Sequence, residues 1–235
     1  MHFDQPARLN GFLFVNKPKG ITAYDVIRQL KVFIGKGKIG HSGTLDPFAT
    51  GLMIIAIGKQ YTKQLSQLIA LDKSYEAEIT LGKTTDTYDC TGVFNEPTAR
   101  TSHLSTETIT ETIHKFIGTI EQQPPAYSAK KINGIPAYKL ARQSKTVTLS
   151  PATITIYDIE IRTVVPPLIS VLVHCSKGTY IRSLAHDIGA SLGVGGHLSS
   201  LSRTRIGGVD LSLATDLNAI NSDNIHQLIQ YEMPN

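Results

Sequence analysis

Cysteine is scarce in this sequence, and long apolar runs are missing. The 235 residues include only two cysteines, Cys90 and Cys175, which lie far apart and form no Cys-x-x-Cys pair. A disulfide framework and a cysteine-rich zinc site are therefore excluded, and free thiols in a reducing compartment are expected. The longest apolar run, residues 52–57, is far shorter than the roughly 20 residues that span a bilayer. The N-terminus also lacks the pattern of a signal peptide, so we expect a cytoplasmic protein with no membrane insertion.

Motifs for common cofactors are absent as well. Residues 35–40 match the glycine pattern of a dinucleotide-binding turn, but a helical pattern precedes them where a strand is required. The Gly-Lys pair at 58–59 differs from a phosphate-binding P-loop in its spacing and in the glutamine that follows. The eight histidines show no metal-ligand spacing, and His186-Asp187 is more typical of a surface pair than of a catalytic dyad. The sequence thus predicts neither a cofactor nor a metal.

Acidic residues are missing from long stretches of a chain whose net charge is +4. Only Asp25 interrupts the basic region between Asp4 and Asp46, and no acid occurs between Glu121 and Asp158. The cations of these regions and of a third one are Arg8, Lys17, Lys19, Arg28, Lys31, Lys36, Lys38, Lys130, Lys131, Lys139, Arg142, Lys145, Lys177, Arg182, Arg203 and Arg205. This distribution is compatible with one positive face for a polyanion and, equally, with ordinary solvated surfaces.

The apolar pattern indicates mixed strands and helices, without the regular βαβ alternation of a doubly wound fold. Strands are predicted at residues 11–18, 52–57, 74–81, 153–161 and 169–175. Helices are predicted after an N-cap at Thr22, at 105–117 with Gly118 as the stop, at 180–192 and near 224–231. Inward positions of the second helix include Ile109, Ile113, Phe116 and Ile117. We expect an α+β domain around a mixed, largely antiparallel central sheet flanked by helices and loops.

The segment around Asp46 combines glycines with a single acid. Gly40, Gly43 and Gly51 surround it in a nearly charge-free stretch, and Pro47 stiffens the turn. A ligand can lie directly against such a chain, and the apolar run that follows anchors the loop. The pattern alone nevertheless favours a helix cap at Asp46, followed by a one-turn helix that ends at Gly51. A catalytic acid and a cap are both open at this point.

Six short motifs lie between about Gly11 and Gly208. One is the segment Gly40-His-Ser-Gly-Thr-Leu-Asp-Pro. The others are Val15-Asn-Lys-Pro-Lys-Gly-Ile-Thr, Lys73-Ser-Tyr with Leu81-Gly-Lys-Thr-Thr-Asp-Thr, Pro124-Pro-Ala-Tyr-Ser-Ala-Lys-Lys, Cys175-Ser-Lys-Gly-Thr-Tyr-Ile-Arg and Leu201-Ser-Arg-Thr-Arg-Ile-Gly. These motifs resemble, in the same order, those of the TruB family of tRNA pseudouridine synthases, and the Gly40 segment resembles the catalytic motif of that family. Any one of them can arise by chance, but six in order are highly specific.

The resemblance implies the pseudouridine synthase fold and an isomerase that converts the T-loop uridine of tRNA, position 55, to pseudouridine. It implies a catalytic domain at residues 1–215, with a thumb-like RNA-binding insertion at about 122–148. Residues 216–235 would be a short C-terminal tail, without the PUA domain of many members. The expected partner is tRNA through its T stem-loop. No membrane and no obligatory protein partner are expected, and the chain should be a monomer.

The resemblance also assigns roles to residues. Asp46 takes the place of the catalytic carboxylate, and Arg182 that of the cation that keeps it charged. Tyr75 corresponds to the tyrosine that stacks on the flipped base. Attack on the sugar, attack on the base and a route through an eliminated sugar all remain compatible with these residues. Without the resemblance, Tyr75 is a half-buried sheet aromatic and Arg182 is a phosphate contact.

Five further residues correspond to substrate-binding positions. His41 would contact RNA near the vacated stack, while Tyr180 and Leu201 would line the uracil pocket. Lys17 would support the loop or touch phosphate, and Lys130 belongs to a basic loop that would touch phosphate. Taken alone, they are a loop histidine, a sheet aromatic, a core leucine and surface cations. The competing hypotheses are an RNA-binding or RNA-folding module and a phosphate-binding hydrolase.

Overall fold

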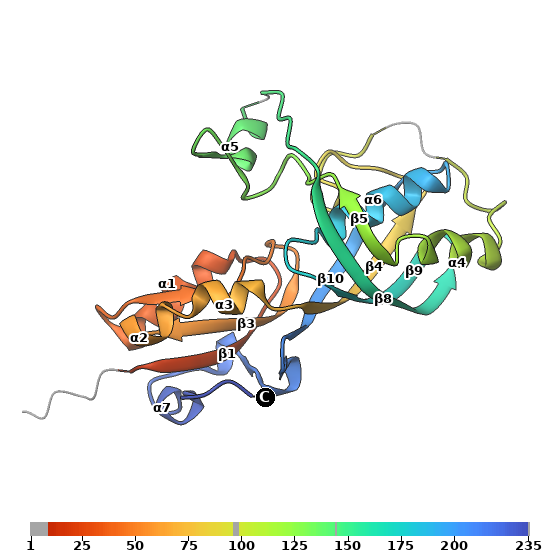
Figure 1. The fold of residues 1–235 in the computed structure, drawn as a ribbon. Coiled ribbons are helices and arrows are strands. Elements are labelled where there is room, and N and C mark those ends of the chain that lie inside the picture. Colours follow the sequence, from red (N-terminus) through yellow and green to blue (C-terminus); the bar gives the residue numbers. More distant parts are fainter. Residues whose placement is uncertain (1–8, 96–98, 144, 235) are drawn as a thin grey trace, which may run out of the picture. The chain divides into compact units, whose positions relative to one another are not determined.

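The computed structural model describes residues 9–95, 99–143 and 145–234, so Arg8 of the basic set lies outside it. The described residues form two compact units. The first unit holds the chain up to Lys73 and from Ser202 onward, and the second holds Ser74–Leu201. Strand β10 (Gly196–Ile206, labelled in Figure 1) contributes to both units. The division between the units falls between Leu201 and Ser202. Among the described residues, no helix has the length and apolarity to cross a membrane.

The first unit is built on strands in the order β12-β1-β3-β10. Besides β10, the strands of this unit are β1 (Gly11–Lys17), β2 (Ile39–His41), β3 (Thr50–Ile57), β11 (Val209–Asp210) and β12 (Thr215–Asp216). β3 pairs antiparallel with β1 and with β2, and β10 pairs antiparallel with β11. The pairs β1 with β12 and β3 with the end of β10 are parallel.

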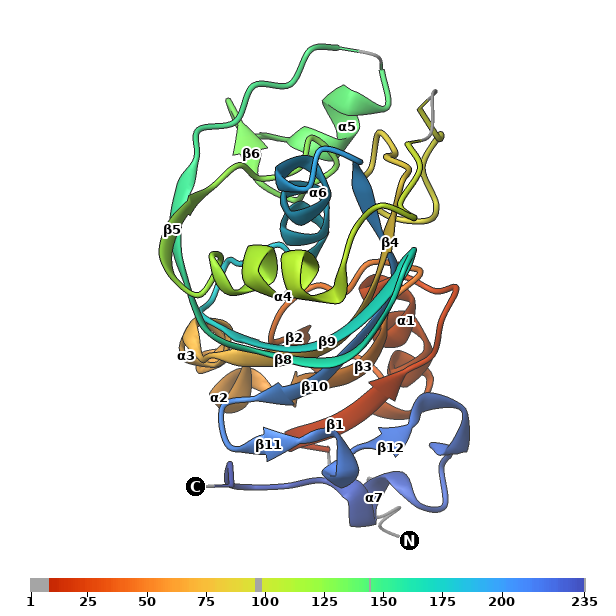
Figure 2. The same cartoon turned by 90° about the vertical axis from the view of Figure 1, so that its right-hand side faces the viewer.

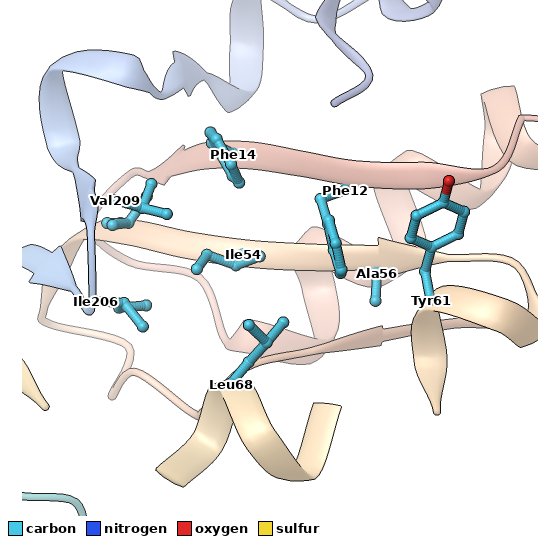
Figure 3. Close-up of a cluster of buried hydrophobic side chains, with 9 residues drawn as sticks. Phe12, Phe14, Ile54, Ala56, Tyr61, Leu68, Ile206 and Val209 are labelled. Atoms are coloured by element: carbon cyan, nitrogen blue, oxygen red, sulfur yellow. The ribbon is translucent and has the colours of Figure 1, made fainter. Parts of the chain in front are cut away.

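Helices and apolar side chains complete the first unit. They are α1 (Ala23–Ile34), α2 (Lys59–Thr62), α3 (Leu65–Ala70), α7 (Ile225–Leu228) and the short 3-10 turns η1 (Leu211–Leu213) and η2 (Leu217–Ala219). In Figure 3, Phe12 of β1 meets Tyr61 of α2 edge to face, with ring centroids 5.0 Å apart. Ile54 of β3 and Leu68 of α3 belong to the same buried cluster. This core fixes β3, whose first residue follows the Asp46 loop.

The second unit contains a curved sheet with strand order β10-β4-β9-β8-β5. The strands are β4 (Lys73–Leu81), β5 (Gly118–Gln122), β8 (Ala152–Val165) and β9 (Leu168–Cys175). Helices α4 (Thr106–His114) and α6 (Ile181–Ser191) lie on one face of this sheet (Figure 2). Between β5 and β8 the chain leaves the sheet and forms β6 (Lys131–Ile132), β7 (Ile135–Pro136) and α5 (Ala137–Ala141).

The predicted α+β class with a mixed, largely antiparallel sheet is confirmed, whereas several element ends were wrong. Helix α4 stops at His114, and the N–H groups of Phe116 and Ile117 bond three residues back to Ile113 and His114. This tightening of the last turn leaves Ile117 39% exposed, although it was expected to face inward. Gly118 begins β5 with a positive φ of 117° instead of capping a helix.

Candidate active site

Asp46 lies on the loop between β2 and β3, residues 42–49. Leu45, Phe48 and Ala49 are buried, whereas Asp46 between them is half-buried. The Ala49 N–H donates to the Asp46 carbonyl at 3.1 Å and closes a single turn. The helix expected after Asp46 is therefore wrong: this fully described loop passes from the turn straight into β3. Apolar side chains on both sides hold the turn, so the carboxylate is presented on a fixed support.

The start of the loop is tied to β3 through Ser42, which is fully buried. The Ser42 N–H donates to the Ile54 carbonyl at 3.0 Å, and the Ile54 N–H donates to Ser42 Oγ at 3.3 Å. On the far side of Asp46, the Gly20 N–H donates to the Pro47 carbonyl at 2.7 Å. Main-chain bonds therefore restrain the loop both before and after its single acid.

Arg203 of β10 also supports this loop, and it is only 2% exposed. Its Nε donates to the Leu52 carbonyl at 2.8 Å, and its two Nη atoms donate to the carbonyls of Gly43 at 3.1 Å and Thr44 at 3.4 Å. A planar guanidinium provides several donors in a fixed geometry, which suits three carbonyls at once. Arg203 thus joins the loop before Asp46 to the strand that follows it.

Gly51 allows β3 and β10 to approach each other at this point. Its φ is +105°, and a Cβ atom here would lie 2.4 Å from the Arg203 carbonyl oxygen. Gly51 pairs with Arg203 in the parallel register of the two strands. The expectation that Gly51 ends a helix was wrong, because the residue lies within β3. Only glycine combines this backbone conformation with this spacing.

Lys17 is fully buried at the end of β1. Its Nζ donates to the carbonyls of Pro18 and Ile21, both at 2.9 Å, and to that of Pro47 at 3.5 Å. Burial lowers the pKa of Lys17 to about 8; the Asp46 carboxylate opposes this shift and the Arg203 cation adds to it. The geometry favours the loop-supporting role of Lys17, and a contact with RNA phosphate stays a prediction.

His41 ends β2, next to the same loop. The Gly43 N–H donates to His41 Nδ1 at 3.3 Å. Burial lowers the pKa of His41, and the Arg203 charge lowers it further. A neutral ring that accepts at Nδ1 carries its proton on Nε2. His41 is thus prepared to donate a hydrogen bond at neutral pH.

Arg182 stands in the first turn of α6 and is 5% exposed. Its Nη1 donates to the Thr87 carbonyl at 2.8 Å, and its Nη2 donates to the Tyr127 carbonyl at 2.8 Å. The carboxylate of Asp89 lies 3.6 Å from Nη1 and also accepts from the Thr91 N–H at 2.8 Å. Three groups of the second unit therefore contact this guanidinium.

The remaining predicted residues of the second unit lie on different elements. Tyr180 precedes α6, and its main chain exchanges two hydrogen bonds with the Gln122 side chain, at 2.8 and 3.0 Å. Tyr75 is half-buried on β4, and Leu201 is buried on β10. Lys130 is half-buried in the segment that leaves the sheet.

The predicted residues thus divide between the units, Lys17, His41 and Asp46 in the first and the others in the second. Sequence reasoning missed two buried charges, Arg203 and Asp89. Arg203 is one of two arginines in the segment that begins at Leu201, and nothing in the local sequence distinguishes it from Arg205. Asp89 lies in a polar, turn-rich segment, where an acid is ordinarily solvated. His186 and Asp187, expected at the surface, are half-buried.

Comparison with known proteins gives a consistent result over most of the sequence. Residues 31–181 match the TruB family pseudouridylate synthase N-terminal domain, and residues 182–230 match the tRNA pseudouridylate synthase B C-terminal domain. The tRNA pseudouridine synthase B of Syntrophotalea carbinolica is 44% identical over 90% of this chain and 69% of that protein. The protein of the same name from Protochlamydia amoebophila is 44% identical over 97% of this chain and 84% of its own length.

Solved structures share the fold. A chain of a Cbf5-Nop10-Gar1 complex is 27% identical, with a TM-score of 0.71 over 94% of this chain. A chain of the archaeal box H/ACA sRNP Nop10-Cbf5 complex is 25% identical, with a TM-score of 0.68 over 96% of this chain. This chain spans 60% of each of those two chains. With a matching fold, two matching family domains and closely similar relatives, the chain belongs to the TruB family of pseudouridylate synthases.

Proposed function

We propose that this chain is a tRNA pseudouridine synthase that isomerises the T-loop uridine, position 55, with Asp46 as its catalytic carboxylate. The observation that carries the proposal is the placement of Asp46. It is the single acid of a loop restrained by buried apolar side chains and by the buried cations Lys17 and Arg203. Relatives named tRNA pseudouridine synthase B support the substrate class.

The reaction is an isomerisation. The bond between N1 of the uracil and C1′ of the ribose breaks, the base turns, and a bond forms between C5 and C1′. C5 loses a proton and N1 gains one, so atoms and electrons balance without a redox partner. The enzyme must therefore expose the target base, hold it while it turns and supply a charged group at the sugar or the base.

Asp46 suits the last requirement if it stays ionised while half-buried. Burial raises the pKa of a carboxylate, whereas neighbouring positive charges lower it. The Asp46 carboxylate and the Arg203 guanidinium both lie close enough to Lys17 for their charges to shift its pKa, and Arg203 binds two carbonyls of the Asp46 loop. Two fixed cations beside the loop therefore favour the carboxylate form at neutral pH.

The base must leave its stack before it reacts, which costs a few kcal/mol. Stacking on an aromatic ring returns about 1–3 kcal/mol. We assign this role to Tyr75, with Tyr180 and Leu201 as further contacts of the uracil and His41 as a contact of the RNA. We assign to Arg182 the positive charge that keeps the catalytic carboxylate ionised. Its three contacts within the second unit suit a group that must keep one orientation.

Contacts with the rest of the RNA come from basic surfaces. The segment between β5 and β8 leaves the sheet and carries exposed cations such as Lys131 and Lys139, beside the predicted contact Lys130. It supports the proposal of a thumb-like insertion at about 122–148 within a catalytic domain at residues 1–215. A cytoplasmic location and a monomeric state complete the proposal, since tRNA modification at the T loop requires neither a membrane nor a second subunit.

The decisive experiment uses an Asp46→Asn variant, which keeps the size of the side chain and removes its charge. Wild-type protein incubated with unmodified tRNA should yield pseudouridine at the T-loop uridine, mapped by chemical modification and primer extension. Asp46→Asn should fold and bind the same tRNA but form no product. Asp158→Asn, at an exposed position of β8, serves as the matched control and should remain active.

Each outcome separates a part of the proposal from the rest. Full activity of Asp46→Asn would remove Asp46 from its role. Tight binding of tRNA by the wild type without any product would favour the RNA-binding module instead. Product at another uridine, or unchanged product in a tRNA whose T-loop uridine is replaced by cytidine, would refute the T-loop assignment.

A further inference from the structure

Tyr88 occupies an unusual place beside Arg182. The residues on either side of it, Thr87 and Asp89, both face the same atom, Nη1 of Arg182, one through its carbonyl and the other through its carboxylate. Tyr88 itself has a φ of +64°, in the left-handed region. A bulky residue adopts this sparsely populated conformation only where its surroundings determine it. The strain therefore lies in the turn that holds the guanidinium.

The ring of Tyr88 shows what maintains this conformation. It stacks on the imidazole of His186, with ring centroids 3.9 Å apart and an angle of 13° between the planes. His186 follows Arg182 by four residues on α6, so the two side chains share one face of the helix. The Tyr88 carbonyl also accepts a hydrogen bond from the Leu198 N–H at 3.0 Å. The ring is thus held by α6 and the main chain by β10.

The His186 ring is suited to parallel stacking. Its Nδ1 is buried and has no hydrogen-bond partner among the described residues, so no polar contact of that atom dictates the plane of the ring. Burial lowers the pKa of His186, which keeps the ring neutral at physiological pH. The Tyr157–His174 pair of the same unit differs, because its rings are tilted by 50° with centroids 5.0 Å apart.

We propose that Tyr88 and His186 form an aromatic clamp that fixes the left-handed turn at residue 88 and thereby aims Thr87 and Asp89 at Arg182. Tyr88 is then a positioning residue that acts through Arg182. The inference rests on the proposed function, because the role of Arg182 in the reaction belongs to that proposal. The clamp explains how Arg182 keeps its orientation. The stacked pair fixes the backbone at residue 88, and the groups on either side of that residue contact the guanidinium.

Loss of the ring has a specific consequence. Without the stack, residue 88 relaxes toward the common negative-φ regions, and the Thr87 carbonyl and the Asp89 carboxylate no longer face Nη1 together. Substrate binding depends on many contacts, whereas turnover depends on the orientation of Arg182. A displacement of about 1 Å in such a group lowers turnover by roughly 100-fold. The clamp therefore predicts an effect on kcat and little effect on KM.

The test compares Tyr88→Leu, Tyr88→Phe and His186→Leu in steady-state assays with tRNA. Tyr88→Leu and His186→Leu should each lower kcat by about 10- to 100-fold, with KM within about threefold of wild type. Tyr88→Phe keeps the stack and should retain wild-type kcat within about twofold. The double variant Tyr88→Leu/His186→Leu should be no worse than either single one, because all three lose the same contact. Tyr157→Leu is the matched control.

Wild-type kcat in a folded Tyr88→Leu variant would overturn the clamp. A loss of kcat in Tyr88→Leu that equals its loss of folded protein would reduce Tyr88 to a structural residue. If Tyr88→Leu fails to fold, the comparison of His186→Leu with His186→Phe, which restores a ring, decides the same question.

A second measurement does not depend on activity. In a thermal-unfolding cycle of Tyr88→Leu and Arg182→Lys, the clamp predicts that the two Tm losses fall short of additivity by about 2–6 °C. Additive losses would overturn the clamp. If the wild type makes no pseudouridine while this coupling is present, the proposed function fails and the clamp stands as a device that orients Arg182 for another purpose.

Discussion

At the scale of single residues, the first unit directs two buried cations at the loop that carries Asp46. Lys17 and Arg203 both donate to main-chain carbonyls of this loop. Buried charges are costly unless hydrogen bonds replace their hydration, and the loop carbonyls supply those bonds. The arrangement serves two ends, because the same cations restrain the backbone and favour a charged carboxylate.

Replacement of Arg203 by lysine separates charge from geometry. Arg203→Lys keeps a cation, but one ammonium cannot reach three carbonyls that a guanidinium fork spans. We expect a loss of about 2–4 kcal/mol in the free energy of unfolding, measured with urea. The kcat for pseudouridine formation should fall by about 10- to 100-fold. Arg205→Lys on the same strand is the control, and a stable, fully active Arg203→Lys would contradict the role given to this residue.

At the scale of elements, helix α6 carries both Arg182 and Asp187, a carboxylate whose burial lowers the stability of the folded state at neutral pH. Burial raises the pKa of Asp187 from 3.8 to about 6. Between these two values, the folded state retains a proton that the unfolded state has released, so stability is lost as pH rises through this window. The helix therefore carries a carboxylate whose charged form is destabilised by burial at neutral pH.

Asp187→Asn removes this penalty. The variant should have a higher Tm than wild type at about pH 7.5, and the difference should largely vanish at about pH 4. Calorimetry at both values measures the effect. Asp223→Asn, at an exposed position of the first unit, should give the same small difference at both values. A Tm difference that is independent of pH in Asp187→Asn would show that the carboxylate is not destabilised.

Helix α1 gives a second prediction at this scale. Thr22 and Asp25 form a capping box, in which each side chain satisfies an N–H group of the other residue. Thr22→Ala removes one of these bonds and should lower stability by about 1 kcal/mol, or Tm by about 2–4 °C. Ser66→Ala, at an exposed position of α3 without a capping role, is the control. An unchanged Tm in Thr22→Ala would be evidence against the cap.

The elements also show how far sequence reasoning reaches. The start of α1 at Thr22 and the buried strand β3 could be predicted, because caps and apolar runs are local signals. The end of α4 could not, since main-chain bonds that tighten its last turn leave no mark on the side chains. Asp46 followed by proline is compatible with a cap and with a simple turn, so only the resemblance to a family located the carboxylate.

The contacts that hold the Asp46 loop and Arg182 in place could not be predicted from local sequence patterns, for a different reason. Arg203 reaches Leu52 and Gly43 only because β10 pairs with β3, and these strands are far apart in the sequence. Likewise, Arg182 bonds to the carbonyls of Thr87 and Tyr127, and a carbonyl carries no residue identity. Sequence reasoning therefore located candidate reactive groups but missed most of what orients them.

At the scale of the whole molecule, part of the uneven charge distribution can be assigned to one surface, because several lysines of the N-terminal basic region lie at the same groove. An open groove of the first unit is lined by Lys31, Lys38, Gly37 and Thr62, among others, and none of its lining residues in the described part of the chain is acidic. Lys36 nearby in the sequence is exposed too. Phosphates of an RNA backbone bind to such clusters mainly through release of counterions, which makes affinity dependent on salt.

Charge removal in this groove tests that role. The double variant Lys31→Gln/Lys38→Gln should bind tRNA more weakly, and its plot of log affinity against log salt should be shallower by about 1–2. Filter binding at several salt concentrations measures the slope. Lys115→Gln, an exposed lysine after α4, is the control and should keep the wild-type slope. An unchanged slope in the double variant would exclude the groove from RNA binding.

Gly51 has a consequence for any map of mutational tolerance. Its Cβ position is occupied by the backbone of Arg203, so every other residue would push apart the two strands beneath the Asp46 loop. In a saturation library selected for activity, position 51 should therefore be as intolerant as position 46. The two signals would differ in origin: substitutions at 46 would leave inactive but folded protein, whereas substitutions at 51 would deplete the folded protein itself.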